Sequence, residues 1–400
     1  MRDTVLALLL VLLAQVTLAA LQLGVPVLAP ALVAALGMRP EAVGLIGGLI
    51  GFGSVWLFAA NSAVTPVLGP LRALIAACLL AVAGAALMLT GLWTAVFVGA
   101  VAIGFAYGVT APAGSQIIAR HSPRRLWGTV FSVRQAGVPA GGALAGLIGA
   151  GLAAAVDWRA GRVALAAMPL AAAALIAFAP ARFAAGASGA RFRARALLAP
   201  GNALSPFRTM RRLPQLVPIA LASLGLGTAH ASTLAFLTTY LTDGLGLSLA
   251  LAGGLYSTMH GASLVGRLVV GVAADWLGST RIMLVAMAVG SAAALVMLSL
   301  MDPGWGRPAL FVAAGLAGVG ISTWNGLYLA EVARLAPPAE VAEATAAVTF
   351  CTFAVYTVAP PAFAALVWLA GYGPAWWCTA AVVLASAGVL VRGARAAPAE

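Results

Sequence analysis

Residues 250–281 read ALAGGLYSTMHGASLVGRLVVGVAADWLGSTR. Up to Ala274 this stretch carries one charged residue, Arg267, and it exceeds the ~20 residues that a helix needs to cross ~30 Å of hydrocarbon. It ends in Asp275, Gly278 and Arg281, which are residues typical of a turn in a polar environment. The stretch therefore predicts a transmembrane helix over residues 250–273 that closes at a charged turn.

The rest of the chain repeats this pattern. Of its residues, 63% are hydrophobic and 8% are charged, against roughly 45–50% and about 25% in an ordinary soluble domain. Twelve apolar segments of spanning length are predicted: residues 5–33, 41–62, 71–90, 94–118, 127–152, 161–180, 214–241, 250–273, 281–300, 307–332, 342–369 and 374–391. We expect an all-α integral membrane protein with two six-helix bundles, residues 1–180 and 214–400, joined by a basic linker over residues 181–213.

Arginine supplies the positive charge and indicates the orientation in the membrane. A net charge of +12 would suggest a nucleic-acid partner in a soluble protein, but here all 22 basic residues are arginine and nearly all lie at segment ends. Most fall on the side of the linker; four fall on the other side, Arg39, Arg159, Arg162 and Arg307. Because basic residues stay in the cytoplasm, we expect both termini and the linker to be cytoplasmic and no nucleic-acid partner. The absence of lysine indicates a GC-rich genome, so a bacterial cytoplasmic membrane is predicted.

The two halves share a weak internal repeat. Gly69-Pro-Leu-Arg72 aligns with Gly278-Ser-Thr-Arg281, and further on Ala119-Arg-His-Ser-Pro123 aligns with Ala333-Arg-Leu-Ala-Pro337. The order of the matches and their similar offsets favour a parallel duplication about an axis normal to the membrane.

The segment from Gly266 to Arg281 resembles the signature between helices eight and nine of the major facilitator superfamily, with Gly-Arg, Gly, Asp, Gly and Arg at matching spacings. The resemblance covers essentially the whole chain and implies a twelve-helix secondary transporter that works by alternating access. The first-half copy keeps Gly69 and Arg72 but has Pro66 in place of the acid. A helix-five segment, Phe131-Ser-Val-Arg134-Gln135-Ala-Gly137-Val-Pro139-Ala-Gly141-Gly142, only loosely matches the pattern of drug/proton antiporters.

The signature predicts a gate at the cytoplasmic mouth. Gly266 and Gly271 would let two helices approach closely, and Asp275, Arg281 and Arg267 would form a charge cluster that latches one bundle to the other. Glu331 is a further candidate member. The complete set of gating candidates is Gly266, Arg267, Gly271, Asp275, Gly278, Arg281, Glu331, Gly69 and Arg72. A purely topological role for these end-of-helix charges is the alternative.

Polar side chains at membrane depth predict the substrate site, since each needs a hydrogen-bond partner or a water-filled cavity. The spacing of Tyr256, His260, Ser263 and Arg267 places them on one helical face. The substrate-binding candidates are Arg134, Gln135, Gln15, Gln22, Tyr107, Gln116, His230, Tyr256, His260, Trp324, Asn325, Tyr328 and Tyr356. Hydrogen bonding within each bundle, with no role in transport, is the alternative for each of them.

The acidic residues all lie at span ends or in loops. Coupling to protons would therefore have to use His230 or His260, or a carboxylate of the substrate. We expect no cofactor, metal site or enzymatic activity, because the chain lacks a phosphate-binding Gly loop ending in Lys, metal-ligand spacing and a nucleophile elbow.

Arg134 decides the predicted substrate class. With no acidic partner at similar depth, an inward-pointing arginine suits an anion, so the leading hypothesis is transport of a small organic anion such as a carboxylate by a monomer in the lipid bilayer, with protons as a candidate coupling ion. Proton-coupled efflux of drug-like compounds is the alternative within transport, and a membrane sensor or scaffold is the alternative from another class. A snorkelling Arg134 would weaken the leading hypothesis.

Overall fold

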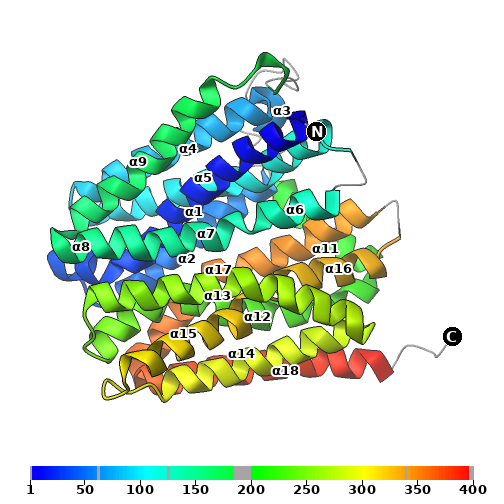
Figure 1. The fold of residues 1–400 in the computed structure, drawn as a ribbon. Helices are drawn as coiled ribbons and strands as arrows, with labels where there is room; N and C mark the ends of the chain where they lie inside the picture. Colours follow the sequence, from blue (N-terminus) through cyan, green and yellow to red (C-terminus); the bar gives the residue numbers. More distant parts are fainter. Residues whose placement is uncertain (1, 61–63, 124–126, 184–199, 338–339, 396–400) are drawn as a thin grey trace. The chain divides into compact units, whose positions relative to one another are not determined.

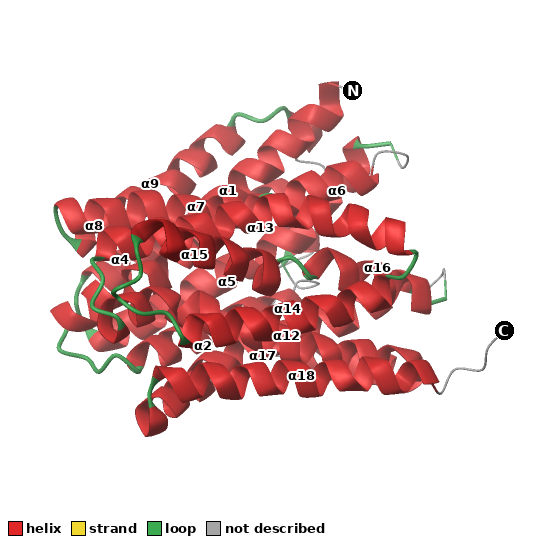
Figure 2. Cartoon of the chain, turned by 60° about the horizontal axis from the view of Figure 1, so that its bottom comes forward, coloured by secondary structure: helices red, strands yellow, loops and turns green. Residues whose placement is uncertain are grey.

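The computed structural model describes residues 2–60, 64–123, 127–183, 200–337 and 340–395. Every regular element of these residues is a helix (Figure 2). Eleven segments are long and apolar enough to span a membrane. The helix α13 (Leu249–Leu277), 29 residues long, corresponds to the remaining predicted span. The twelve predicted segments therefore each coincide with helical structure, and the prediction of an all-α membrane protein is confirmed.

The first half of the chain contains six spans. Their elements are α1 (Arg2–Ala35), α2 (Ala42–Ala59), α3 (Thr65–Leu68), α4 (Pro70–Leu89), α5 (Trp93–His121), α6 (Trp127–Gln135), α7 (Gly137–Leu144), a π-helical turn (Ala145–Ala150), α8 (Gly151–Ala155), α9 (Trp158–Ala177) and a 3-10 turn (Ala181–Phe183). The fifth span is thus built from three short helices and a π turn, with its first break at Ala136. Arg134 lies just before that break.

The second half also contains six spans. Its elements are α11 (Pro200–Arg212), a 3-10 turn (Pro214–Leu216), α12 (Val217–Thr239), a π turn (Tyr240–Gly244), α13, α14 (Thr280–Ser299), α15 (Arg307–Ser322), α16 (Asn325–Leu335), α17 (Val341–Ala370) and α18 (Tyr372–Arg395). The tenth span is divided between α15 and α16 by Thr323 and Trp324. This break within a span places main-chain carbonyl groups at the end of α15 that α16 does not pair.

Glycines end several helices because they adopt the left-handed backbone conformation without steric cost. The two copies of the internal repeat share this feature: Gly69 has a φ of 79° and Gly278 has a φ of 62°. Gly69 directly precedes α4, and Gly278 lies two residues before the start of α14. The short sequence match between the halves therefore corresponds to a shared turn.

The chain divides into two compact units. The first comprises residues 1–39 and 49–203, and the second comprises residues 40–48 and 204–400. The domain boundaries expected from the sequence, residues 1–180 and 214–400, stay a prediction. In the division by contacts, residues 40–48 group with the second unit.

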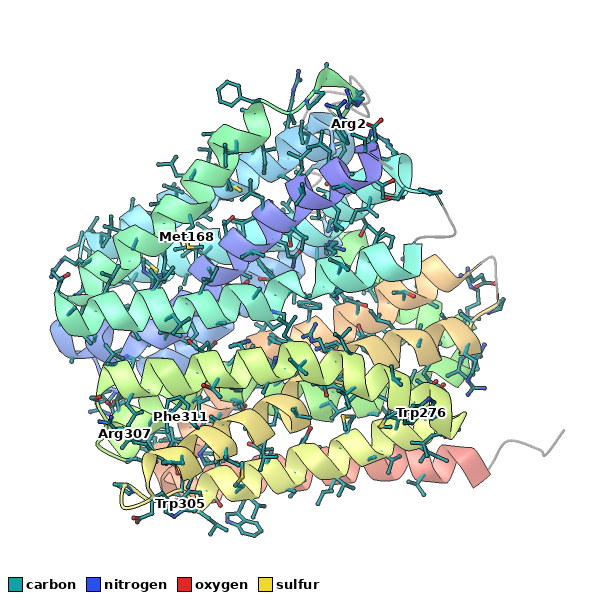
Figure 3. The ribbon with its side chains drawn as sticks, viewed as in Figure 1. Arg2, Met168, Trp276, Trp305, Arg307 and Phe311 are labelled. Atoms are coloured by element: carbon teal, nitrogen blue, oxygen red, sulfur yellow. The ribbon has the colours of Figure 1, made fainter. Side chains whose placement is uncertain are left out.

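Within the first unit α1 packs against α5, α7 and α9, and α4 packs against α5. Within the second unit α13 packs against α15, and α14 lies beside α18 (Figure 1). Large apolar side chains remain exposed on outer helix faces, for example Leu175 and Val312, as expected where lipid is the solvent. Figure 3 shows Trp276 at one end of the second unit and Trp305 and Arg307 at the opposite end, positions typical of membrane–water interfaces.

Part of the predicted linker is helical. In α11 the Phe207 ring packs edge-on against Phe350 of α17, with ring centroids 6.3 Å apart. Arg212 forms an ion pair of 2.9 Å with Glu340. The described part of α11 from Leu204 onward therefore packs within the second unit, which the basic composition of the linker did not predict.

Candidate functional site

Arg134 is buried in the interior of the first unit, where its side chain is only 4% exposed. Its Nη1 donates to Ser115 Oγ of α5 at 3.1 Å. Its Nη2 donates to Gln15 Oε1 of α1 and to the main-chain oxygen of Thr110 of α5, each at 3.3 Å. The guanidinium thus links three spans and does not extend toward a helix end as a snorkelling side chain would.

Glycines create the space for this arrangement. A Cβ on Gly114 would lie 3.2 Å from Arg134 Nε and 2.7 Å from a methyl group of Val11. A Cβ on Gly137 would lie 3.0 Å from Gln15 Cγ, and one on Gly141 would lie 2.6 Å from both Ala19 Cβ and the Val16 oxygen. The fifth span therefore approaches α1 closely on the side that carries Arg134.

The charge of Arg134 is not neutralised within the described residues. All three of its hydrogen-bond acceptors are uncharged, and its buried Nε has no partner. Tyr107, a predicted site residue, interacts with it electrostatically. A guanidinium is effectively always protonated, so this position holds a permanent positive charge with one unused donor.

The structure brings two of the candidates, Gln15 and Arg134, into contact, and it adds Ser115 and Thr110. The other first-unit candidates, Gln22, Tyr107, Gln116 and Gln135, are half-buried. Ser115 was missed as a site residue because a hydroxyl in an Ala- and Gly-rich helix is equally typical of ordinary helix packing.

Histidines and aromatic side chains form a second polar cluster, in the second unit. The Tyr356 hydroxyl and His230 Nδ1 are 3.0 Å apart. The rings of Tyr256 and His260 are 4.7 Å apart, and those of Trp324 and Tyr328 are 5.2 Å apart. Among the described residues, three buried polar atoms here have no partner: Tyr256 Oη, His260 Nε2 and Trp324 Nε1.

The broken tenth span lies beside this cluster. Ser263 Oγ and Arg267 Nη2, both on α13, donate to the main-chain oxygen of Ser322 at 3.3 and 3.2 Å. Ser291 Oγ donates to the oxygen of Gly320 at 2.6 Å. Side chains of α13 and α14 therefore satisfy carbonyl groups at the end of α15, where a cation such as Arg267 also interacts favourably with the helix dipole.

Tyr328 and Asn325 lie on α16, after the break. The Tyr328 hydroxyl and Thr349 Oγ1 of α17 are 2.8 Å apart. Asn325 is half-buried at the start of α16. These two candidates and Trp324 thus follow one another along the chain, while His230, His260 and Tyr356 come from three other spans.

The predicted gate is only partly described. The side chain of Asp275 lies outside the described residues. Arg281 donates twice to the main-chain oxygen of Leu390 on α18, and Arg267 donates to α15 as above. Glu331 is buried and pairs with Arg334 one turn along its own helix at 2.6 Å. Arg72 is exposed. A charge cluster of Asp275, Arg267 and Arg281 stays a prediction.

Gly266 and Gly271 of the signature differ in the space around them. A Cβ on Gly266 would lie 2.9 Å from Thr323 Cγ2, so Gly266 does allow a close approach to the end of α15. A Cβ on Gly271 would meet nothing within 4 Å. The prediction that Gly271 permits close helix packing is therefore wrong for this structure.

Arg162 was counted as one of four topological charges on the side opposite the linker, and its burial was not predicted. It is fully buried, at 0% exposure, one turn inside α9. The first turn of α9 includes Trp158, and the sequence places Arg162 on the same helical face, four residues later. Such spacing was the available signal for an inward-facing arginine.

Comparison with known proteins identifies the family. The model of the Major Facilitator Superfamily matches residues 10–360. No match was found among curated protein sequences. The chain belongs to the major facilitator superfamily and is a multi-pass membrane transporter, not an enzyme.

Solved transporters share this fold. A mutant of the nucleoside transporter NupG has 15% sequence identity and a TM-score of 0.75, and the alignment covers 97% of this chain and 99% of that one. The peptide transporter POT in complex with sulfate has 15% identity and a TM-score of 0.78, with 97% and 94% covered. A POT family transporter in complex with 5-aminolevulinic acid has 12% identity and a TM-score of 0.75, with 96% and 95% covered.

Proposed function

We propose that this member of the superfamily transports a small organic anion, with a carboxylate bound at Arg134, by alternating access of its two units. The observation that supports this most strongly is the permanent charge of Arg134, buried among neutral acceptors with Nε unused. Burying a charge without a counter-charge is costly. A carboxylate would remove that cost, because it accepts charge-assisted hydrogen bonds from a guanidinium.

Neutral acceptors position the guanidinium without competing for its charge. Gln15, Ser115 and the Thr110 carbonyl fix the plane of the group through its two terminal nitrogens. An Asp or Glu at any of these positions would form a buried ion pair and would compete with a bound anion. The site is thus suited to an anion that must bind and then leave.

The second unit supplies candidates for the other substrate contacts. Tyr256 Oη and Trp324 Nε1 are unused hydrogen-bond donors, and His260 Nε2 can donate or accept according to its tautomer. Aromatic rings around them would contact an apolar part of the solute. We therefore propose Arg134 as the charge-recognising residue of the first unit, and these side chains as the candidates for substrate recognition in the second unit.

Coupling and orientation are further parts of this proposal. His230 and His260 are the buried groups through which we expect protons to couple to transport. The distribution of arginine supports cytoplasmic termini in a bacterial cytoplasmic membrane, and we propose a monomeric transporter.

The solved relatives do not assign the substrate. Their titles name a nucleoside transporter and peptide transporters, one of them in complex with sulfate, and identities of 12–15% relate them to this chain by fold. The organic-anion proposal rests on Arg134.

The test is a substrate screen on the purified, reconstituted chain. Thermal-shift screening against carboxylates, sugars, amino acids and drug-like cations identifies ligands, and uptake of the labelled hits into proteoliposomes measures transport. We expect carboxylate hits whose uptake is lost in Arg134→Gln and retained in Arg211→Gln, since Arg211 is exposed on α11. Hits confined to drug-like cations, with uptake insensitive to Arg134, would favour the efflux alternative.

A further inference from the structure

Arg162 lies in the first unit and has fewer partners than its burial requires. Its Nη1 donates to the main-chain oxygen of Leu21 on α1 at 3.4 Å, near the limit of a hydrogen bond. Its Nε and Nη2 are buried and have no hydrogen-bond partner among the residues that the structure describes. A guanidinium has five N–H groups, of which Nε carries one and Nη2 two. At least three buried donors of Arg162 are therefore unused.

The start of α9 packs closely against the π turn of the fifth span. A Cβ on Gly161 would meet the main-chain oxygen of Gly149, and one on Gly149 would lie 2.8 Å from Leu165 Cδ1. Arg162 follows Gly161 directly, and its side chain is fully buried.

A second unused donor lies one turn away. Trp158 is 5% exposed and its Nε1 is buried without a partner. Trp158 and Arg162 are four residues apart on α9, so their side chains lie on the same face with Cβ atoms ~6 Å apart. The indole can only donate a hydrogen bond, and both residues therefore lack an acceptor on the same face of α9.

Charges near Arg162 do not supply that acceptor. No carboxylate of the described residues forms an ion pair with Arg162. The closest acid along the chain, Asp157, caps α9 by accepting from the Ala160 nitrogen at 2.7 Å. The Asp157 side chain does not accept from the other main-chain N–H groups of the first turn. The dipole of this 20-residue helix is positive at the same end.

We propose that Arg162 and Trp158 form an anion-binding site that takes a small carboxylate or an oxyanion of similar size. The Nε–Nη2 edge of Arg162 is free, and this edge pairs bidentately with two oxygens of one anion. The indole N–H of Trp158 donates a third hydrogen bond.

This site is separate from Arg134. Arg134 contacts Gln15 of α1 and Arg162 contacts Leu21 of α1, six residues further on, which is ~9 Å along the helix axis. The proposal does not depend on the transported substrate being an anion. The anion at Arg162 compensates a buried charge between α1 and α9, so its first effect is on stability.

Sodium formate is the probe, because it is the smallest carboxylate and a buried site admits it most readily. Thermal unfolding of the purified chain is measured against formate concentration, with sodium HEPES keeping the ionic strength constant. We expect a saturable rise in Tm in the parent chain. Trp158→Phe keeps the ring and removes the donor, and should raise the half-saturating formate concentration about tenfold. Trp93→Phe, which removes an indole donor bound to the Leu36 oxygen elsewhere in the unit, should leave that concentration unchanged.

Two further variants locate the bound formate. Because Arg134 is itself proposed to bind a carboxylate, the formate titration is made in the Arg134→Gln background. The saturable effect should persist in that background, and adding Arg162→Gln should abolish it. If Arg162→Gln does not fold, Trp158→Phe and Arg134→Gln decide the question. An absent formate effect in the parent chain, an unchanged half-saturating concentration in Trp158→Phe, or loss of the effect in Arg134→Gln would each overturn the proposal. Because transport is not measured, failure here leaves the organic-anion proposal to its own test.

Discussion

The buried polar clusters of the two units differ in the kind of charge that they hold. In the first unit, Arg134 is a permanent cation among neutral acceptors. In the second unit, His230 and His260 titrate near neutrality when unperturbed and lie among aromatic rings. Arg267 of the second unit donates to the end of α15. Under the proposed function, this difference would give attraction of an anion to the first unit and sensitivity to protons to the second.

This comparison implies that the two properties can be separated by mutation. A change at Arg134 or its neighbours should alter anion affinity at every pH. A change at His230 or His260 should alter the pH profile with less effect on affinity at a single pH. The following variants test that separation, beginning with the largest expected effect.

Gln15→Glu should reduce affinity for the transported anion most, by on the order of 100-fold, while Arg134 stays in place. The new carboxylate would lie where Gln15 Oε1 now accepts from Arg134 Nη2 at 3.3 Å, and the resulting buried ion pair would compete with the substrate. Equilibrium binding to purified protein measures the change. Gln215→Glu is the matched control for an added carboxylate, since Gln215 is exposed and is not a binding candidate. Equal loss in both variants would contradict a specific role for the Gln15–Arg134 contact.

The double variant His230→Gln with His260→Gln should flatten any dependence of transport on pH between about 5 and 8. Gln is uncharged throughout this range and can still form a hydrogen bond with the Tyr356 hydroxyl, which now lies 3.0 Å from His230 Nδ1. Proteoliposome uptake at a series of pH values measures the effect. A double variant that keeps the parent profile would show that coupling, if present, uses other groups.

Gly141→Ala should lower the free energy of unfolding by about 1–3 kcal/mol, because its Cβ would lie 2.6 Å from Ala19 Cβ and the Val16 oxygen of α1. It should also weaken anion binding several-fold, since it separates the helices that carry Arg134 and Gln15. Gly151→Ala is the control on the same span, because a Cβ there meets nothing within 4 Å. Denaturation and binding are measured on both variants, and similar behaviour of the two would remove the packing argument.

The sequence was sufficient for the fold because the spans are long apolar blocks that lipid requires to be helical. It was also sufficient to select Arg134 and Gln15 individually. Their contact could not be derived, because 119 residues separate them and composition does not specify which helix faces meet. The same limit applies to Gly271, whose spacing matched the family signature although the structure places no neighbour within 4 Å of its Cβ.

Arg162 and α11 were misjudged for a different reason. Both lie near predicted segment ends, where arginine is most often a topological charge. The side chain of Arg162 is buried and donates to the main-chain oxygen of Leu21 in another span, α1. In α11 the apolar residue Phe207 packs on Phe350 of α17, a contact between two separate helices. Tertiary contacts of this kind are invisible to local patterns.

The central claim is that the planar guanidinium of Arg134 binds the anionic group of the substrate. The most direct measurement is the equilibrium affinity of a carboxylate identified in the substrate screen for the parent chain, Arg134→Lys and Arg134→Ala, each confirmed to be folded. Lysine keeps the charge but cannot form a bidentate pair. We predict that Arg134→Lys loses most of the affinity and Arg134→Ala nearly all of it, by about 100-fold or more. Parent-like affinity in folded Arg134→Ala would contradict the account.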